Sequence, residues 1–156
     1  MTDYEKIETV KRIIIEVLNA MGFSATVEFE DSITKGLIFN INTSNSFLII
    51  GRQGVALHAL QSVIQSLTAK IFKNQTPFIF SLDVDDYKRK REWFLKEIAK
   101  GAVEQVKRTG RPVALEPMPN FERKFIHSFL QENHPDISSE SSGFDPHRKI
   151  IVRRIS

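Results

Sequence analysis

The chain has 156 residues and is 41% hydrophobic, which allows one ordinary domain or two small ones and is too apolar for a disordered chain. The absence of cysteine excludes disulfides, thiolate catalysis and Cys-based zinc sites. No apolar run approaches a membrane span, and residues 1–11 carry acids rather than a signal-peptide pattern, so we expect a soluble cytoplasmic protein.

The net charge of +3 is unevenly distributed along the chain. Residues 1–85 hold 7 basic and 9 acidic side chains, whereas residues 86–156 hold 15 basic and 10 acidic ones. A basic second half suits a polyanionic partner.

The apolar periodicity of the first part predicts a helix from Tyr4 to Ala20, followed by a strand over residues 25–30. A hairpin turn over 31–35 then leads to a strand from Gly36 to Asn42. A short helix is expected from Ser44 to Ile50, capped by Ser44 or Asn45. A longer helix is predicted from Val55 to about Phe72. Its buried stripe is expected to contain Leu57, Leu60, Val63, Ile64, Leu67 and Ile71. Residues 73–77 break that helix, and Phe78, Phe80, Leu82 and Val84 then alternate with Ile79, Ser81, Asp83 and Asp85 as a third strand.

The second part predicts a long helix over residues 86–108, whose buried side would carry Tyr87, Phe94, Ile98, Ala102 and Val106. The Lys88–Arg91 run that opens it is typical of a solvated helix end, with phosphate contact and nuclear import as alternatives. After a Gly-then-Pro stop and a short extended segment, we expect a helix from Asn120 to about Asn133, with Asn120 as its cap, and two strands over 137–142 and 149–155.

A Gly-x-x-Gly turn between the short helix and the longer one is the first candidate site. Gly51 and Gly54 let the backbone turn tightly and allow another chain to approach closely. The helix that follows presents its N–H groups and the positive end of its dipole, and Arg52 and Gln53 add a cation and an amide. Such a turn can bind phosphate, although a helix–turn–helix connection can also use the same glycines.

The charge distribution around this turn favours the phosphate interpretation. There is no Asp or Glu from Ser32 to Leu82, where about six would be expected from the average composition, while Lys35, Arg52, Lys70 and Lys73 are present. A polyanion requires such a surface.

The predicted helix over 120–133 holds the second candidate site. Arg123 and His127 are four residues apart, so both project from one side of this helix, with Lys124 alongside. A guanidinium can fork onto a phosphate, and an imidazole can stack on a base or donate to a phosphate. An ordinary polar helix face is the alternative. Acid–base cleavage of RNA by His127 with Glu122 or Glu132 has little support, because nothing in the sequence places a second catalytic group.

These motifs resemble those of a known family. The run from Ile49 to Gly54, followed by Leu57 and Leu60, resembles the nucleic-acid-binding signature of KH domains, and the helix–strand–strand–helix–helix–strand order resembles their type II arrangement. Segments 109–113 and 115–118, with Glu122, Arg123 and His127, resemble the R-3-H domain, named for its Arg-x-x-x-His motif. The two in this order resemble the bacterial Jag family, also called KhpB or SpoIIIJ-associated proteins.

The resemblance implies an α/β (α+β) fold, with a type II KH-like α-β-β-α-α-β module over residues 1–85 and a small α/β R-3-H module over 86–156. It implies a non-catalytic RNA chaperone or regulator, linked to cell elongation and division, with no cofactor and no metal. Single-stranded RNA (or single-stranded DNA) would bind at Gly51, Arg52, Gln53 and Gly54, with Ile50, Val55 and Leu57 shaping an apolar groove, and again at Arg123, Lys124 and His127.

Family members are often paired with a small single-KH-domain protein, so pairing with such a protein or self-association, as a protein-interaction scaffold, is the alternative function. Many members also carry an additional N-terminal domain. Here the predicted first helix begins almost at Met1, so a membrane-insertase or sporulation role that depends on that domain is not expected.

Overall fold

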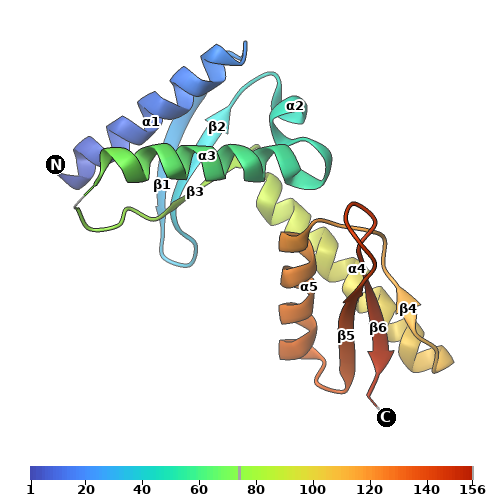
Figure 1. The fold of residues 1–156 in the computed structure, drawn as a ribbon. Coiled ribbons are helices and arrows are strands. Elements are labelled where there is room, and N and C mark those ends of the chain that lie inside the picture. Colours follow the sequence, from blue (N-terminus) through green and yellow to red (C-terminus); the bar gives the residue numbers. More distant parts are fainter. Residues whose placement is uncertain (74, 156) are drawn as a thin grey trace. The chain divides into compact units, whose positions relative to one another are not determined.

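The computed structural model describes residues 1–73 and 75–155. The chain forms two compact units, Met1–Lys88 and Arg89–Ser156, each with its own sheet and core (Figure 1). No helix in the described residues is both long and apolar enough to cross a membrane.

The first unit contains the predicted order of elements. These are α1 (Asp3–Ala20), β1 (Thr26–Ser32), β2 (Gly36–Asn42), α2 (Ser46–Ile50), the 3-10 turn η1 (Arg52–Gly54), α3 (Val55–Ile71) and β3 (Phe80–Val84). A capping box between Thr2 and Glu5 begins α1. Asn45, one of the two predicted caps, occupies the N-cap position of α2 but makes no side-chain hydrogen bond there.

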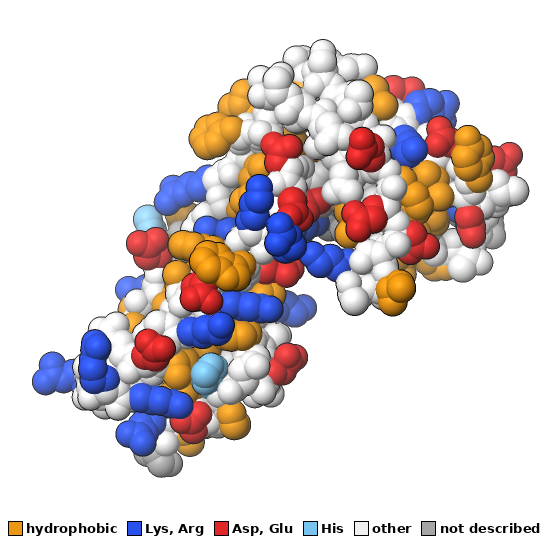
Figure 2. Space-filling model, turned by 180° about the vertical axis from the view of Figure 1, so that it is seen from behind, with side chains coloured by type: hydrophobic (Ala, Val, Ile, Leu, Met, Phe, Trp, Pro, Cys, Tyr) orange, Lys and Arg blue, Asp and Glu red, His pale blue; other side chains and the backbone are white. Residues whose placement is uncertain are grey.

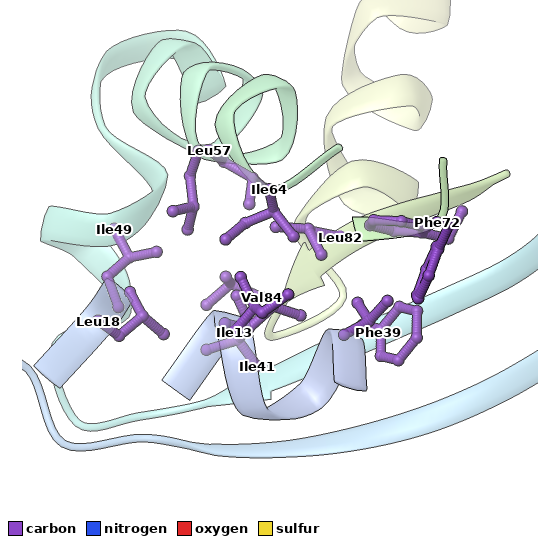
Figure 3. Packing of buried hydrophobic residues seen from close by; sticks show 14 residues of the cluster. Ile13, Leu18, Phe39, Ile41, Ile49, Leu57, Ile64, Phe72, Leu82 and Val84 are labelled. Atoms are coloured by element: carbon purple, nitrogen blue, oxygen red, sulfur yellow. The ribbon is translucent and has the colours of Figure 1, made fainter. Parts of the chain in front are cut away.

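The sheet of this unit has the order β1-β2-β3, with β1 antiparallel and β3 parallel to β2. Its core gathers apolar side chains from α1, β2, α2, α3 and β3 (Figure 3). Phe39, on the central strand, is fully buried and packs against Phe80 with ring centroids 5.2 Å apart. The fold class predicted from the sequence is thereby confirmed for this unit.

Burial along α3 differs from the prediction. Leu57, Leu60 and Ile64 are buried as expected, but Val63, Leu67 and Ile71 are exposed. The apolar positions of this helix cover more of its circumference than the sheet and α1 can bury. The helix ends at Ile71 as expected, while Asn74, in the predicted break, lies outside the described residues.

Asp83 was expected on the solvent side of the third strand and is buried instead. Its Oδ1 accepts hydrogen bonds from the backbone N–H groups of Val84 (2.8 Å) and Lys88 (3.2 Å), where the next helix begins. Burial raises the pKa of this carboxyl above its usual value. The side chain therefore serves the connection from β3 to the following helix.

The second unit is built on α4 (Tyr87–Thr109), whose first two residues belong to the first unit, and continues with β4 (Val113–Ala114), α5 (Asn120–Asn133), β5 (Ile137–Ser142) and β6 (Lys149–Arg154). The sheet order is β4-β6-β5, with both pairs antiparallel. Its core joins Leu95, Ala99 and Val103 of α4 to side chains of α5 and the sheet, among them Ile126, Leu130, Ile150 and Val152.

The buried stripe of α4 is only partly the predicted one. Ala102 and Val106 are buried, but Leu95 and Ala99 take the inner positions, and Phe94 is 45% exposed. Two apolar stripes compete on this helix, and small side chains such as Ala99 let the helix approach its neighbours closely. The predicted cap Asn120 is the first residue of α5, and Pro119 occupies the N-cap position without a side-chain hydrogen bond.

Candidate nucleic-acid-binding sites

The glycine turn has an unusual backbone. Gly51, Gln53 and Gly54 all have positive φ angles, of 72°, 54° and 74°. A positive φ is easily adopted by glycine and is uncommon for other residues, so the two glycines suit their positions and Gln53 is held in a less favourable conformation.

Packing is a second reason for both glycines. A Cβ at Gly51 would lie 2.6 Å from the Cβ of Ala56, and one at Gly54 would lie 2.8 Å from the Cε1 of Tyr87. Real Cβ contacts are not this short, so a side chain at Gly51 would push Ala56 and its backbone away, and a side chain at Gly54 would require the Tyr87 ring to move. Tyr87, the first residue of α4, thus packs closely against the second glycine.

The turn delivers the chain into the 17-residue helix α3. Gly54 is the N-cap of this helix and has no side chain to cap it, and the first turn of the helix contains no acidic residue that would neutralise the positive end of its dipole. Arg52 is exposed in the turn, and Gln53 is half-buried. Gln53 also takes part in an interaction within the protein.

The predicted apolar groove beside the turn needs correction. Leu57 is 1% exposed and points into the core, as Figure 3 shows, so it supports the turn and cannot line a surface groove. Ile50 is half-buried and packs against the same core, whereas Val55 is exposed.

Two exposed apolar side chains near the turn were missed. Phe47 is 84% exposed and Leu48 is also exposed, both on α2 immediately before Gly51. The backbone N–H of Gly51 donates to the carbonyl of Phe47 at 3.0 Å, which ties α2 to the turn. The signal in the sequence was the run of four apolar residues from Phe47 to Ile50, which exceeds what one face of a single helical turn can bury.

Arg123, on α5, does not lie on the surface. It is 4% exposed, and its Nη1 donates to the carbonyl of Met118 (2.6 Å) and to Oδ1 of Asp145 (3.2 Å). Its Nε is buried without a hydrogen-bond partner in the described part of the chain. In this conformation the guanidinium ties the segment before α5 and the β5–β6 loop to the helix, so a direct phosphate contact is not available to it.

His127 is half-buried and faces β5. Its Nδ1 lies 2.7 Å from Oγ of Ser139, and its Nε2 lies 2.9 Å from Oγ of Ser141. Burial, and then the nearby charge of Arg123, lower the pKa of this imidazole. The two serines were not predicted as site residues, although their alternation after Ile137 indicated a polar strand face toward α5.

The same side chains line a shallow pocket, whose other residues include Gln131, Pro135, Glu140 and Ile155. Lys124 is exposed on α5. This face therefore offers an imidazole hydrogen-bonded to serine hydroxyls and a nearby cation, in place of the exposed Arg–His pair that was predicted.

The geometry gives no support to acid–base cleavage by His127. Both carboxylate oxygens of Glu122 accept hydrogen bonds from Arg91, at 2.7 and 3.0 Å, and both ring nitrogens of His127 are taken by serine hydroxyls. Within the described residues no three His, Asp or Glu side chains form a group that could hold a metal ion.

Comparison with known proteins gives one domain match and several similar proteins. Residues 94–154 match the family model of the R-3-H domain. The chain is 34% identical to RNA-binding protein KhpB of Lactiplantibacillus plantarum, over 89% of this chain and 42% of that protein. It is 32% identical to the KhpB of Clostridium symbiosum, over 88% and 61%, and 29% identical to that of Bacillus subtilis, over 95% and 70%.

The R-3-H match falls within the second unit. The resemblance predicted from the sequence is confirmed, because the chain contains an R-3-H domain match and is similar over most of its length to several proteins named KhpB. The chain spans about half the length of the first two of these relatives.

Proposed function

We propose that this protein binds single-stranded RNA through the first unit's glycine turn, acting as a KH domain, and through the R-3-H unit. The observation that carries the proposal is the glycine turn, whose two glycines are required by packing and whose helix N-terminus and Arg52 lie in a stretch without acids. The match to the R-3-H family and the name of the relatives, RNA-binding protein KhpB, support it.

At the turn, we expect a phosphate to lie near the N-terminus of α3 and Arg52. Backbone N–H groups and a positive dipole end favour an anion there without regard to base sequence. The exposed apolar side chains of Phe47, Leu48 and Val55 would then contact bases or riboses beside the backbone.

In the R-3-H unit, the proposed contacts are Lys124 with a phosphate, and the hydroxyls and imidazole of the shallow pocket with a base or ribose. The role of Arg123 is changed from that expected, since it would act by holding the helix and its flanking loops in place. Single-stranded DNA is the alternative ligand, and competition between the two nucleic acids would rank them.

In this proposal the protein binds RNA without cleaving it, as an RNA chaperone or regulator. The cellular role in elongation and division follows from the family resemblance of the sequence.

The test is a binding titration with the full chain and a labelled single-stranded RNA at several salt concentrations. Replacing Arg52 and Gln53 by Asp should weaken binding strongly, because two carboxylates would repel the phosphate. At Arg52, which is exposed, the free energy of unfolding should change by no more than about 0.5 kcal/mol. The control is Arg12→Asp, an exposed position on α1. Equal losses in both proteins would show that net charge alone matters, and an unchanged affinity in the folded double variant would refute the site.

A second candidate function is supported by a different observation. Val55, Val63, Leu67 and Ile71 form an exposed apolar row along α3, with Ala59 completing the spacing of four. A row of this kind is typical of a helix that packs against another protein. A scaffold role, pairing with a KH-domain protein or with a second copy, predicts concentration-dependent association that Leu67→Lys abolishes without changing RNA affinity.

A further inference from the structure

The exposed face of α4 carries an aromatic side chain that the fold does not use. Trp93 is the only tryptophan of the chain and is 65% exposed, although tryptophan is usually among the most buried residues on average. Neighbouring Phe94 is 45% exposed. Neither belongs to the buried core of the second unit, which takes Leu95, Ala99 and Val103 from this helix.

The surroundings of Trp93 are basic. Residues three, four and seven positions away share its side of a helix, and here they include Arg89, Lys90, Lys96 and Lys100. The acid at this spacing, Glu97, is paired with Lys100 at 3.3 Å. Figure 2 shows Lys and Arg side chains beside hydrophobic ones on the surface of the second unit.

These cations have contacts within the protein, but those contacts keep them on the surface. Lys96 lies 5.9 Å from the ring centroid of Phe129, and the Lys100–Glu97 pair is exposed at both ends. Exposed pairs of this kind are worth little, so a phosphate can displace or share them at small cost. Arg89 and Lys90 also make interactions within the protein.

The combination selects one class of ligand. A flat aromatic surface among cations suits a nucleobase stacked on the ring with its phosphates beside the ammonium groups. A protein partner fits less well, because the buried centre of a protein interface is depleted of lysine, and four cations would have to lose water around one indole.

We propose that Trp93 is a base-stacking platform, with Lys96 and Lys100 neutralising the adjacent phosphates, and that α4 is a further contact site for single-stranded RNA. The site rests on the proposed RNA-binding function and adds to it. Trp93 lies just before the segment that matches the R-3-H family, residues 94–154.

The experiment uses the full chain and the fluorescence of its single tryptophan. Addition of an oligo-uridine of about 20 nucleotides should quench the indole fluorescence, because a base stacked on the ring is in direct contact with it. Inorganic polyphosphate, which has the charge but no bases, should bind without comparable quenching. A salt titration should show that Lys96→Ala with Lys100→Ala lowers the slope by about 1.4, at about 0.7 for each phosphate of a single strand that is no longer neutralised.

Variants distinguish a loss of base stacking from a loss of folding. Trp93→Ala should weaken oligo-uridine binding by roughly 5- to 140-fold, the effect of one lost base stack, and Trp93→Phe should restore part of it. Phe144→Ala is the matched control, since Phe144 is another exposed aromatic of the same unit, and it should bind like the wild type. Thermal melts should be unchanged for all three. If Trp93→Ala does not fold, Trp93→Phe and the wild-type fluorescence titration decide.

The failures can be told apart. Tight RNA binding with no change in indole fluorescence and no loss in Trp93→Ala overturns the stacking site and leaves the proposed function standing. No RNA binding by the wild-type chain overturns both. Indole fluorescence that depends on protein concentration without RNA, together with unchanged RNA affinity in Trp93→Ala, would assign this face to a protein contact instead.

Discussion

The glycine turn and the Arg-x-x-x-His helix show two ways in which a short motif relates to a binding surface. In the turn, the motif residues set the backbone: Gly51 and Gly54 adopt positive φ angles at places where a Cβ would collide with Ala56 or Tyr87. In the helix, the motif residues set the packing, because Arg123 is buried and His127 is held by two serines. A conspicuous pair of polar side chains can therefore organise a surface without being part of it.

The largest effect is expected where the turn depends on glycine. Gly54→Ala should lower the stability of the first unit by about 2–4 kcal/mol, because the strain of a positive φ adds to the overlap with Tyr87. Hydrogen exchange of the β2 and β3 amides in the full chain measures this loss.

Gly36→Ala is the control for that variant. Gly36 has a φ of 74° but nothing within 4 Å of an added Cβ, so only the backbone strain remains, about 1–2 kcal/mol. Equal losses at the two glycines would contradict a packing role for Tyr87.

Arg123→Ala should destabilise the second unit, by about 2–4 kcal/mol. It removes hydrogen bonds to Met118 and Asp145 and leaves a buried space beside them. Denaturation of the full chain, followed by the hydrogen exchange of α5 and β6 amides, tests the change.

Lys124→Ala tests whether Lys124 and the adjacent Arg123 have different roles. Lys124 is exposed, so its loss should change stability by less than about 0.5 kcal/mol while weakening RNA binding and lowering the salt slope by about 0.7. If Arg123→Ala instead left stability unchanged and weakened binding alone, the structural assignment of Arg123 would be wrong.

A smaller effect should appear in the pH dependence. The folded unit lowers the pKa of His127 below 6.5, so the unfolded chain takes up a proton first as pH falls. The second unit should therefore keep its full stability above pH 6.5 and lose part of it as pH falls through the lowered pKa. Thermal melts between neutral and mildly acidic pH should show this loss, His127→Gln should reduce it, and His147→Gln should leave it in place.

Much of the fold could be predicted from periodicity. The helices, both hairpin strands of the first unit and the strands after α5 follow clear patterns of apolar residues and turn residues. The buried face of α4 could not be predicted from the sequence, because two apolar stripes run along the helix. One stripe contains Phe94 and Ile98, and the other contains Leu95 and Ala99. Which stripe is more deeply buried depends on the elements that pack against the helix in the folded chain.

The sequence predicted which segments hold the candidate sites, but it did not predict the roles of all their side chains. The glycine turn could be located because its residues lie together in sequence. The environment of Arg123 depends on Asp145, and that of His127 on Ser139 and Ser141, which are contacts formed only in the folded chain. Trp93 was missed because its neighbours in the sequence indicated a solvated basic helix end.

The measurement that tests the central claim most directly is a map of backbone amide shifts in the full chain during titration with single-stranded RNA. The proposal predicts the largest changes at Arg52–Val55 and the first turn of α3, with a second group near Lys124 and β5, all of them reduced by added salt. Changes confined to α1 and β1, with the turn unaffected at saturating RNA, would contradict it.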